Sequence, residues 1–124
     1  DLDYLRSLPE YSVIEADRYR ILFTHYVYPN ISGLKKEFYT YRDEFSQHFQ
    51  YMNNMTCSIS FTGHTHIRGF FAATPKKYKQ YRYKRYKLND EPVCFGIPPI
   101  TNLNKRNGFC IFDTDNASIK VIKL

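Results

Sequence analysis

The sequence predicts an α/β (α+β) fold in which mixed and antiparallel strands are flanked by helices. Several short segments alternate apolar and polar residues, as strands do. One long segment, from Leu34 to about Met55, has apolar residues at steps of four and three, which is typical of an amphipathic helix. The C-terminal residues 108–124 form two alternating segments around a polar turn, the pattern of a β-hairpin.

The N-terminal residues predict a short helix and then a hairpin. Residues 1–7 place leucines along one side and precede Pro9, which ends a helix. Residues 11–15 and 19–24 alternate around Ala16-Asp17-Arg18 and predict paired strands. Residues 29–33 are rich in turn formers and predict a loop.

The long amphipathic helix is the clearest single element in the sequence. Its apolar stripe consists of Leu34, Phe38, Tyr41, Phe45, Phe49 and Met52. We expect this stripe to pack against the sheet and not to form a ligand groove. His48 lies off the stripe, so the pattern predicts a surface position for it.

Further strands are predicted over residues 57–62 and 68–74, and the closing hairpin over 108–113 and 118–124. Cys57, Cys94 and Cys110 are odd in number, lack Cys-x-x-Cys spacing and adjoin apolar or β-forming residues. They are interpreted as buried reduced thiols, which favours a cytoplasmic compartment. No apolar run reaches about 18 residues, so no membrane span is predicted.

Two predicted strands end alike, in Phe-Thr followed by histidine: Phe23-Thr24-His25 and Phe61-Thr62-Gly63-His64-Thr65-His66. Ligands gather outside the carboxyl ends of sheet strands, so these histidines could converge on one site. In an extended chain His64 and His66 point the same way, and Gly63 permits the turn that exposes them. Neutral imidazole suits zinc, manganese and iron. The alternative is histidines on an exposed loop, and the second histidine-terminated strand favours metal binding.

The run into Thr24-His25, the helical spacer and Gly63-His64-Thr65-His66 resemble the second half of a calcineurin-like metallophosphoesterase. Residues 2–9 also resemble the helix after the Gly-Asn-His motif in the small bacterial phosphodiesterase type, and the closing strands fit that family's C-terminal hairpin. The family's Asp-x-His, Gly-Asp and Gly-Asn-His segments have no counterpart here. The resemblance therefore implies that residues 1–124 are the C-terminal part of one metallophosphoesterase β-sandwich domain whose N-terminal half is absent.

The resemblance implies a hydrolase that cleaves phosphodiesters or phosphomonoesters at a site with two divalent ions, manganese being favoured over iron, zinc or nickel. Two such ions, about 3.5–4 Å apart, activate a bridging hydroxide. His25 and His64 would serve one ion and His66 the other. Arg68 could reach a substrate phosphate or pair with a surface carboxylate. The remaining ligands and the residue that assists the leaving group would lie in the missing half, so the chain alone is expected to be inactive.

Residues 76–87 contain seven basic residues and no acidic ones. Without them the 18 basic residues fall to 11, against 12 acidic residues in the chain. One interpretation is a phosphate- or nucleic-acid-binding ribbon, which underlies the alternative function of a non-catalytic interaction scaffold. The other, which we favour, is an edge strand whose lysines prevent edge-to-edge pairing.

Two further possibilities follow from the same residues. His25, His64, His66 and a water could form a self-contained mononuclear site, which ranks below the two-metal interpretation. A truncated domain would also expose apolar surface where its sheet partners belonged, so a homo-oligomer of this chain is a possible partner state.

Overall fold

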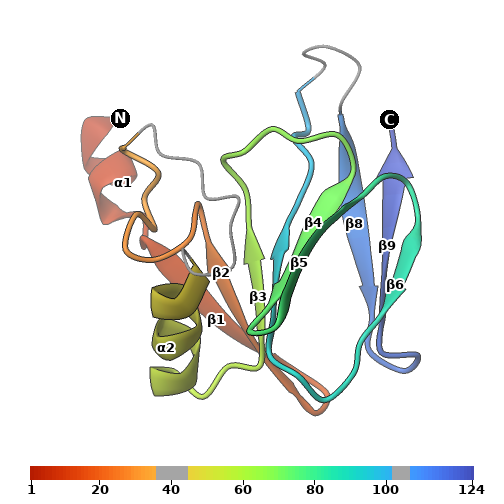
Figure 1. Cartoon of the computed structure of the whole chain (residues 1–124). Coiled ribbons are helices and arrows are strands. Elements are labelled where there is room, and N and C mark those ends of the chain that lie inside the picture. Colours follow the sequence, from red (N-terminus) through yellow and green to blue (C-terminus); the bar gives the residue numbers. More distant parts are fainter. Residues whose placement is uncertain (36–44, 102–106) are drawn as a thin grey trace.

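The computed structural model describes residues 1–35, 45–101 and 107–124, and it is a mixed α/β protein rich in strands (Figure 1). Its elements in chain order are α1 (Leu2–Ser7), β1 (Tyr11–Ala16), β2 (Tyr19–Thr24), α2 (Ser46–Asn54), β3 (Ile59–Thr62), β4 (Phe70–Thr74), β5 (Lys77–Tyr81), β6 (Arg85–Lys87), β7 (Val93–Gly96), β8 (Gly108–Asp113) and β9 (Ser118–Lys123). The α/β class, with mixed and antiparallel strands, is confirmed.

The strands form two sheets. One has six strands in the order β1-β2-β3-β7-β4-β5, and the other has three in the order β6-β9-β8. In the larger sheet β3 runs parallel to both β2 and β7, while the remaining pairs are antiparallel. Thr24 of β2 lies opposite Thr62 of β3, so these two strands end at the same edge of the sheet.

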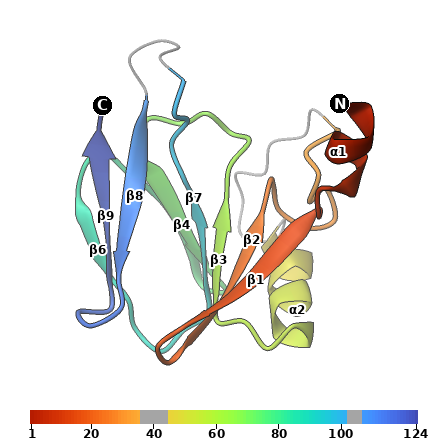
Figure 2. The ribbon, with the colours of Figure 1, turned by 180° about the vertical axis from the view of Figure 1, so that it is seen from behind.

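Apolar side chains pack on both faces of the six-stranded sheet. Between the two sheets the rings of Phe23, Phe61 and Phe95 form a stacked row, each centroid 5.4 Å from the next. On the opposite face α2 packs Met52 into a cluster with Leu22. Figures 1 and 2 show α2 beside β1 and β2, on the side away from the three-stranded sheet. Because side chains alternate along a strand, β3 sends Phe61 into one layer and Ser60 into the other.

The predicted N-terminal helix and both hairpins are confirmed. Asp1 caps α1 by accepting a hydrogen bond from the backbone N–H of Asp3 at 3.0 Å. The first hairpin pairs Tyr11 with Thr24, and the last pairs Gly108 with Lys123. The strands predicted over 57–62 and 68–74 occur as the shorter β3 and β4.

The long helix was predicted to begin too early. Leu34 is 88% exposed and lies outside any helix, and α2 begins at Ser46. Residues 36–44, which include Phe38 and Tyr41 of the predicted stripe, lie outside the described residues. Among the described residues of the stripe, Phe45, the residue before α2, and Met52 within it are buried in the core.

The predicted surface position of His48 was wrong. Its exposed fraction is 0%, and it shares the inner face of α2 with Met52, four residues further along. The pattern failed because histidine counts as polar in a periodicity analysis, whereas here both ring nitrogens have hydrogen-bond partners inside the protein.

The basic segment 76–87 forms two edge strands in different sheets, β5 and β6. Its seven basic side chains are all exposed, whereas its tyrosines are half-buried. Tyr81 stacks on Phe70 with 5.0 Å between ring centroids, and Tyr86 meets Phe95 at 5.3 Å. The prediction of an edge strand is confirmed. Tyr81 and Tyr86 pack against the core, so their rings are not arranged on the surface to stack on bases.

The three cysteines are free thiols, as predicted. Cys57 and Cys94 are buried, while Cys110 is only half-buried. Burial raises the pKa of Cys94 and of Cys110 to about 12. Among the described residues, no helix combines the length and apolar character needed to cross a bilayer.

Candidate functional site

Two histidines meet at the edge where β2 and β3 end. The backbone N–H of Gly63 donates to the carbonyl of His25 at 2.9 Å, which continues the parallel pairing beyond Thr24 and Thr62. Nε2 of His25 then lies 3.2 Å from Nδ1 of His64, with 5.2 Å between the ring centroids. The structure therefore brings together two of the histidines that the sequence predicted to converge.

His64 lies at the centre of a tight three-residue turn. The backbone N–H of Thr65 donates to the carbonyl of Gly63 at 2.8 Å, and His64 has φ 67°, as in a γ-turn. His66 also has a positive φ, of 46°. Left-handed backbone at a non-glycine residue costs about 1–3 kcal/mol and is concentrated at functional sites. Three other non-glycine residues, at turns elsewhere in the described part of the chain, also have positive φ, so this backbone conformation is not by itself evidence of a function.

The structure corrects two expectations about this segment. Gly63 does not have a positive φ, and a Cβ there would meet only the carbonyl oxygen of His25, at 3.4 Å. The residue that makes the turn is therefore His64. His64 and His66 do not lie on extended chain either, so the alternation rule that would point both imidazoles the same way does not apply.

Gly33 is a site residue that the sequence analysis treated only as loop material. It has φ 68°, and a Cβ there would lie 2.8 Å from Nδ1 of His64 and 2.9 Å from Nε2 of His25. Hydrogen bonds from Gly33 N–H to the Asn30 carbonyl, at 2.8 Å, and from Tyr26 N–H to the Ile31 carbonyl, at 2.9 Å, hold the loop in this position. Only glycine leaves room for both rings.

The surroundings of His64 favour its neutral form. Burial lowers the pKa of His64, and the nearby charges of His25 and His66 lower it further. A hydrogen bond with the backbone of Lys35 opposes these effects and raises the pKa. A bond with that effect stabilises the protonated ring, so the Lys35 backbone acts as the acceptor. A backbone acceptor of this kind orients many metal-binding histidines.

His66 and Arg68 do not join the His25–His64 pair. Both are exposed, and across the described residues no group of three histidine, cysteine, aspartate or glutamate side chains is arranged to hold a metal ion. The guanidinium of Arg68 lies 5.9 Å from the centre of the Tyr83 ring. This contact with an aromatic ring differs from both roles that the sequence suggested for Arg68, which were binding a substrate phosphate and pairing with a surface carboxylate.

The spacing of the pair is suited to a shared metal ion. Two nitrogen ligands, each about 2.0–2.1 Å from a tetrahedral ion, lie about 3.3–3.4 Å apart. The observed 3.2 Å between Nε2 of His25 and Nδ1 of His64 is close to this spacing, but it is also a hydrogen bond in which one ring donates to the other, so an ion would have to replace that bond. Because structural and catalytic ions take at least three protein ligands, the pair supplies part of a coordination shell and not all of it.

Two hollows adjoin the histidine edge. One, of about 250 Å³, is lined by His25 together with Glu10, a carboxylate that the sequence analysis did not single out. The other, of about 280 Å³, is almost wholly apolar and opens between the sheets beside Phe23 and Phe61, one residue before Thr24 and Thr62. Its outer wall includes Phe109 and Ile100, both well exposed.

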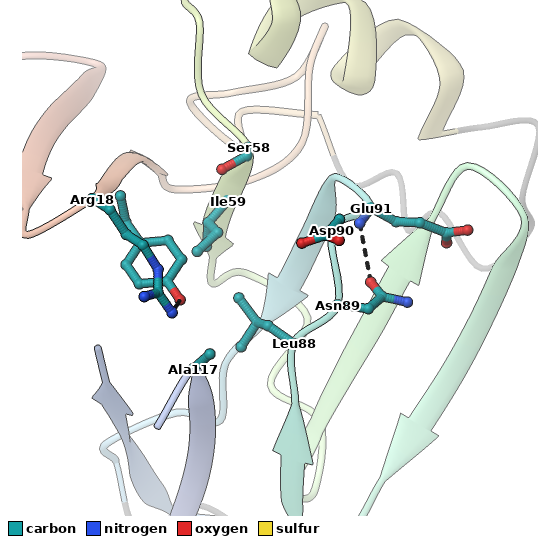
Figure 3. Close-up of a pocket in the computed structure, with 9 residues that line it drawn as sticks. Arg18, Ser58, Ile59, Leu88, Asn89, Asp90, Glu91 and Ala117 are labelled. Atoms are coloured by element: carbon teal, nitrogen blue, oxygen red, sulfur yellow. Dashed lines mark hydrogen bonds between the residues drawn. The ribbon is translucent and has the colours of Figure 1, made fainter. Parts of the chain in front are cut away.

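A third hollow, of about 330 Å³, lies at the opposite ends of the same strands (Figure 3). It is lined by Tyr19 and Ile59, the first residues of β2 and β3. Arg18 donates to the hydroxyl of Tyr19 at 2.9 Å on one wall, and Asp90 stands on the other. This end of the sheet is separate from the histidines, so its residues provide controls for experiments on the pair.

Comparison of the chain with family models, with curated proteins and with solved structures gives no match. The function of the histidine pair is therefore inferred from its own geometry and from the motifs in the sequence.

Proposed function

We propose that this chain provides part of the metal centre of a two-metal phosphoesterase. The observation that carries the proposal is the 3.2 Å separation of Nε2 of His25 and Nδ1 of His64 at the carboxyl ends of adjacent parallel strands. A glycine packed against both rings adds support.

In this proposal His25 and His64 hold one ion and His66 contributes to a second. The bound ions, with manganese favoured, would activate a water molecule and polarise the phosphoryl oxygen of a phosphate ester. The chain's own residues fix the position of the ligands. Neutral imidazoles also add no negative charge to a site that must accept an anionic substrate, and the lowered pKa of His64 keeps that ring in its ligating form.

The remaining ligands are proposed to come from residues outside this chain. Two histidines cannot complete a two-metal site, and several apolar residues elsewhere on the described part of the chain are exposed. α1 has no buried residue and leaves Leu2 70% exposed, and Ile111 of β8 is 50% exposed. The apolar hollow beside Phe61 is open as well. Surfaces of this kind are typical of contacts within a larger fold or between chains.

The scaffold alternative receives less support from the structure. It depends on the basic segment 76–87 as a binding surface for phosphates or bases. The tyrosines that would stack on bases are packed against Phe70, Phe71 and Phe95, and Lys76 pairs with Glu91 at 2.5 Å. Only the exposed cations remain for such a surface, and they also serve to block edge pairing.

The proposal is tested by metal content and by hydrolysis of a chromogenic phosphodiester with manganese, measured on this chain and on the full gene product. We expect activity in the full product only, and its loss in the variants His25→Ala and His64→Ala. Arg18→Gln, at the opposite end of the sheet, is the matched control and should keep activity. A full product that neither binds metal nor hydrolyses the ester would overturn the proposal, and activity in this chain alone would favour the mononuclear site.

A further inference from the structure

His48 connects the two segments that carry the histidine pair. Its Nδ1 accepts a hydrogen bond from the backbone N–H of Tyr28 at 2.9 Å, and its Nε2 lies 3.0 Å from Oγ of Ser60. Tyr28 follows His25 by three residues, and Ser60, a residue of β3, precedes His64 by four. A single buried side chain therefore contacts both the loop that leaves β2 and the strand that leads into the second histidine.

The hydrogen bonds fix the tautomer of His48. A backbone N–H can only donate, so Nδ1 must be unprotonated and the proton of the neutral ring is on Nε2. Nε2 then donates to Ser60. Burial lowers the pKa of His48 to about 4, in agreement with a neutral ring. The ring thus makes two directed bonds, which a hydrophobic residue of similar volume could not replace.

The loop that His48 supports is the one that places Gly33 against the histidine pair. Tyr26 and Val27, the two residues before Tyr28, are fully buried. Asn30 N–H donates to the Val27 carbonyl at 2.9 Å, and Gly33 N–H donates to the Asn30 carbonyl at 2.8 Å. These two backbone hydrogen bonds link Val27, the residue before Tyr28, to Gly33 by way of Asn30.

We propose that His48 is a positioning residue for the metal site: by bonding Tyr28 and Ser60 at once, it holds the His25 loop in register with β3 and so sets the separation of the His25 and His64 ring nitrogens. This inference rests on the proposed function for its consequence in metal binding, but the geometric part concerns this chain alone. Groups that orient metal ligands without touching the ion alter affinity by about ten- to hundredfold when removed.

The test compares His48→Phe, which keeps the volume and removes both hydrogen bonds, with His48→Gln, which can donate and accept. Val121→Ala is the control, because Val121 is buried in the three-stranded sheet and its truncation destabilises the protein without touching the loop. All variants are measured at a temperature where each is folded. Two readouts are used: Zn²⁺ affinity of the full gene product by calorimetry, and NMR of the His25 and His64 ring nitrogens of this chain with amide exchange of Tyr28 and Gly33.

We expect His48→Phe to weaken Zn²⁺ binding by about ten- to hundredfold, to shift the two ring signals and to speed exchange of the loop amides, with partial recovery in His48→Gln. Val121→Ala should leave the affinity within about twofold of the original chain. Unchanged ring signals and loop exchange in His48→Phe would overturn the positioning role, as would an equal loss of affinity in Val121→Ala.

Failure of the proposed function has a different signature. In that case the unsubstituted full gene product binds no Zn²⁺, yet the ring signals of this chain still report the His25–His64 contact. The NMR comparison then decides the positioning role without reference to any metal.

Discussion

Alanine at Gly33 should disturb the histidine pair, whereas alanine at Gly63, within the Gly-His-Thr-His motif, should not. A Cβ at Gly33 would lie 2.8 Å from Nδ1 of His64 and 2.9 Å from Nε2 of His25, and the residue has φ 68°. A Cβ at Gly63 would meet only the His25 carbonyl, at 3.4 Å, which is ordinary contact. The Gly63 backbone is also outside the left-handed region.

The magnitude follows from two costs at Gly33. An alanine held in the left-handed region costs about 1–2 kcal/mol, and an extra methyl group in a filled space costs about 1–3 kcal/mol. The exposed His25 ring can relieve the second cost by rotating away from His64. Restoring the pair for an ion would then require about 2 kcal/mol, which corresponds to about a 30-fold loss of affinity.

The assay is calorimetric titration of the full gene product, which would hold the complete site, with Zn²⁺, accompanied by urea unfolding of this chain. We expect Gly33→Ala to bind about 30-fold more weakly and Gly63→Ala to bind within about twofold of the original chain. Equal affinities in the two variants, or a Gly63→Ala variant weaker than Gly33→Ala, would show that the histidine pair is not shaped as described.

Three further outcomes are expected. Burial lowers the pKa of His48 in the folded chain from 6.5 to about 4. As the pH falls, the unfolded chain therefore takes up a proton before the folded chain does. The free energy of unfolding should fall by about 2.6 kcal/mol between about pH 8 and about pH 4.5. Urea unfolding at both values should show that loss, and His48→Gln should lack it; an equal loss in the variant would refute a neutral buried ring. The double variant Lys84→Gln/Arg85→Gln should leave Zn²⁺ affinity unchanged by calorimetry, since both side chains are exposed on the basic segment; a tenfold drop would connect that segment to the site. Cys94, with a pKa of about 12 and no exposed surface, should react with a thiol reagent only after unfolding, and labelling of the folded chain at that residue would contradict its burial.

The alternation of apolar and polar residues predicted the two strands that carry the histidine pair. Alternation along residues 19–24 and 57–62 identified the strands and their ends, and the parallel pairing then brought His25 and His64 together. The turn at His64 could not be predicted in the same way. Gly63 is the residue that usually takes a positive φ, and only the tertiary structure shows that His64 takes it.

The contributions of Gly33 and His48 were hidden for a related reason. Gly33 matters because two rings from distant segments fill the space where its side chain would be, and no short-range pattern records that contact. His48 counts as polar and was therefore placed off the apolar stripe, whereas its hydrogen-bond partners Tyr28 and Ser60 lie outside the helix, where its periodicity does not record them. The basic segment shows the same limit: its uniform composition conceals the bend between β5 and β6, where Lys84 N–H donates to the Arg82 carbonyl at 2.9 Å.

The parallel pairing of β2 and β3 also governs when the site can form during folding. β2 and β3 are neighbours in the sheet, but the long segment between Thr24 and Ile59 must form a closed loop before they pair. β1 and β2, in contrast, are joined by a tight turn. Non-local parallel pairings form slowly, because the entropy cost of closing the loop comes before the strand contacts that offset it. We therefore expect the hairpin that carries His25 to form before β3 pairs with β2 and brings His64 to it. Capture of an ion by both imidazoles would report completion of the central sheet, and an ion added to a refolding chain would stabilise only molecules that have passed that step.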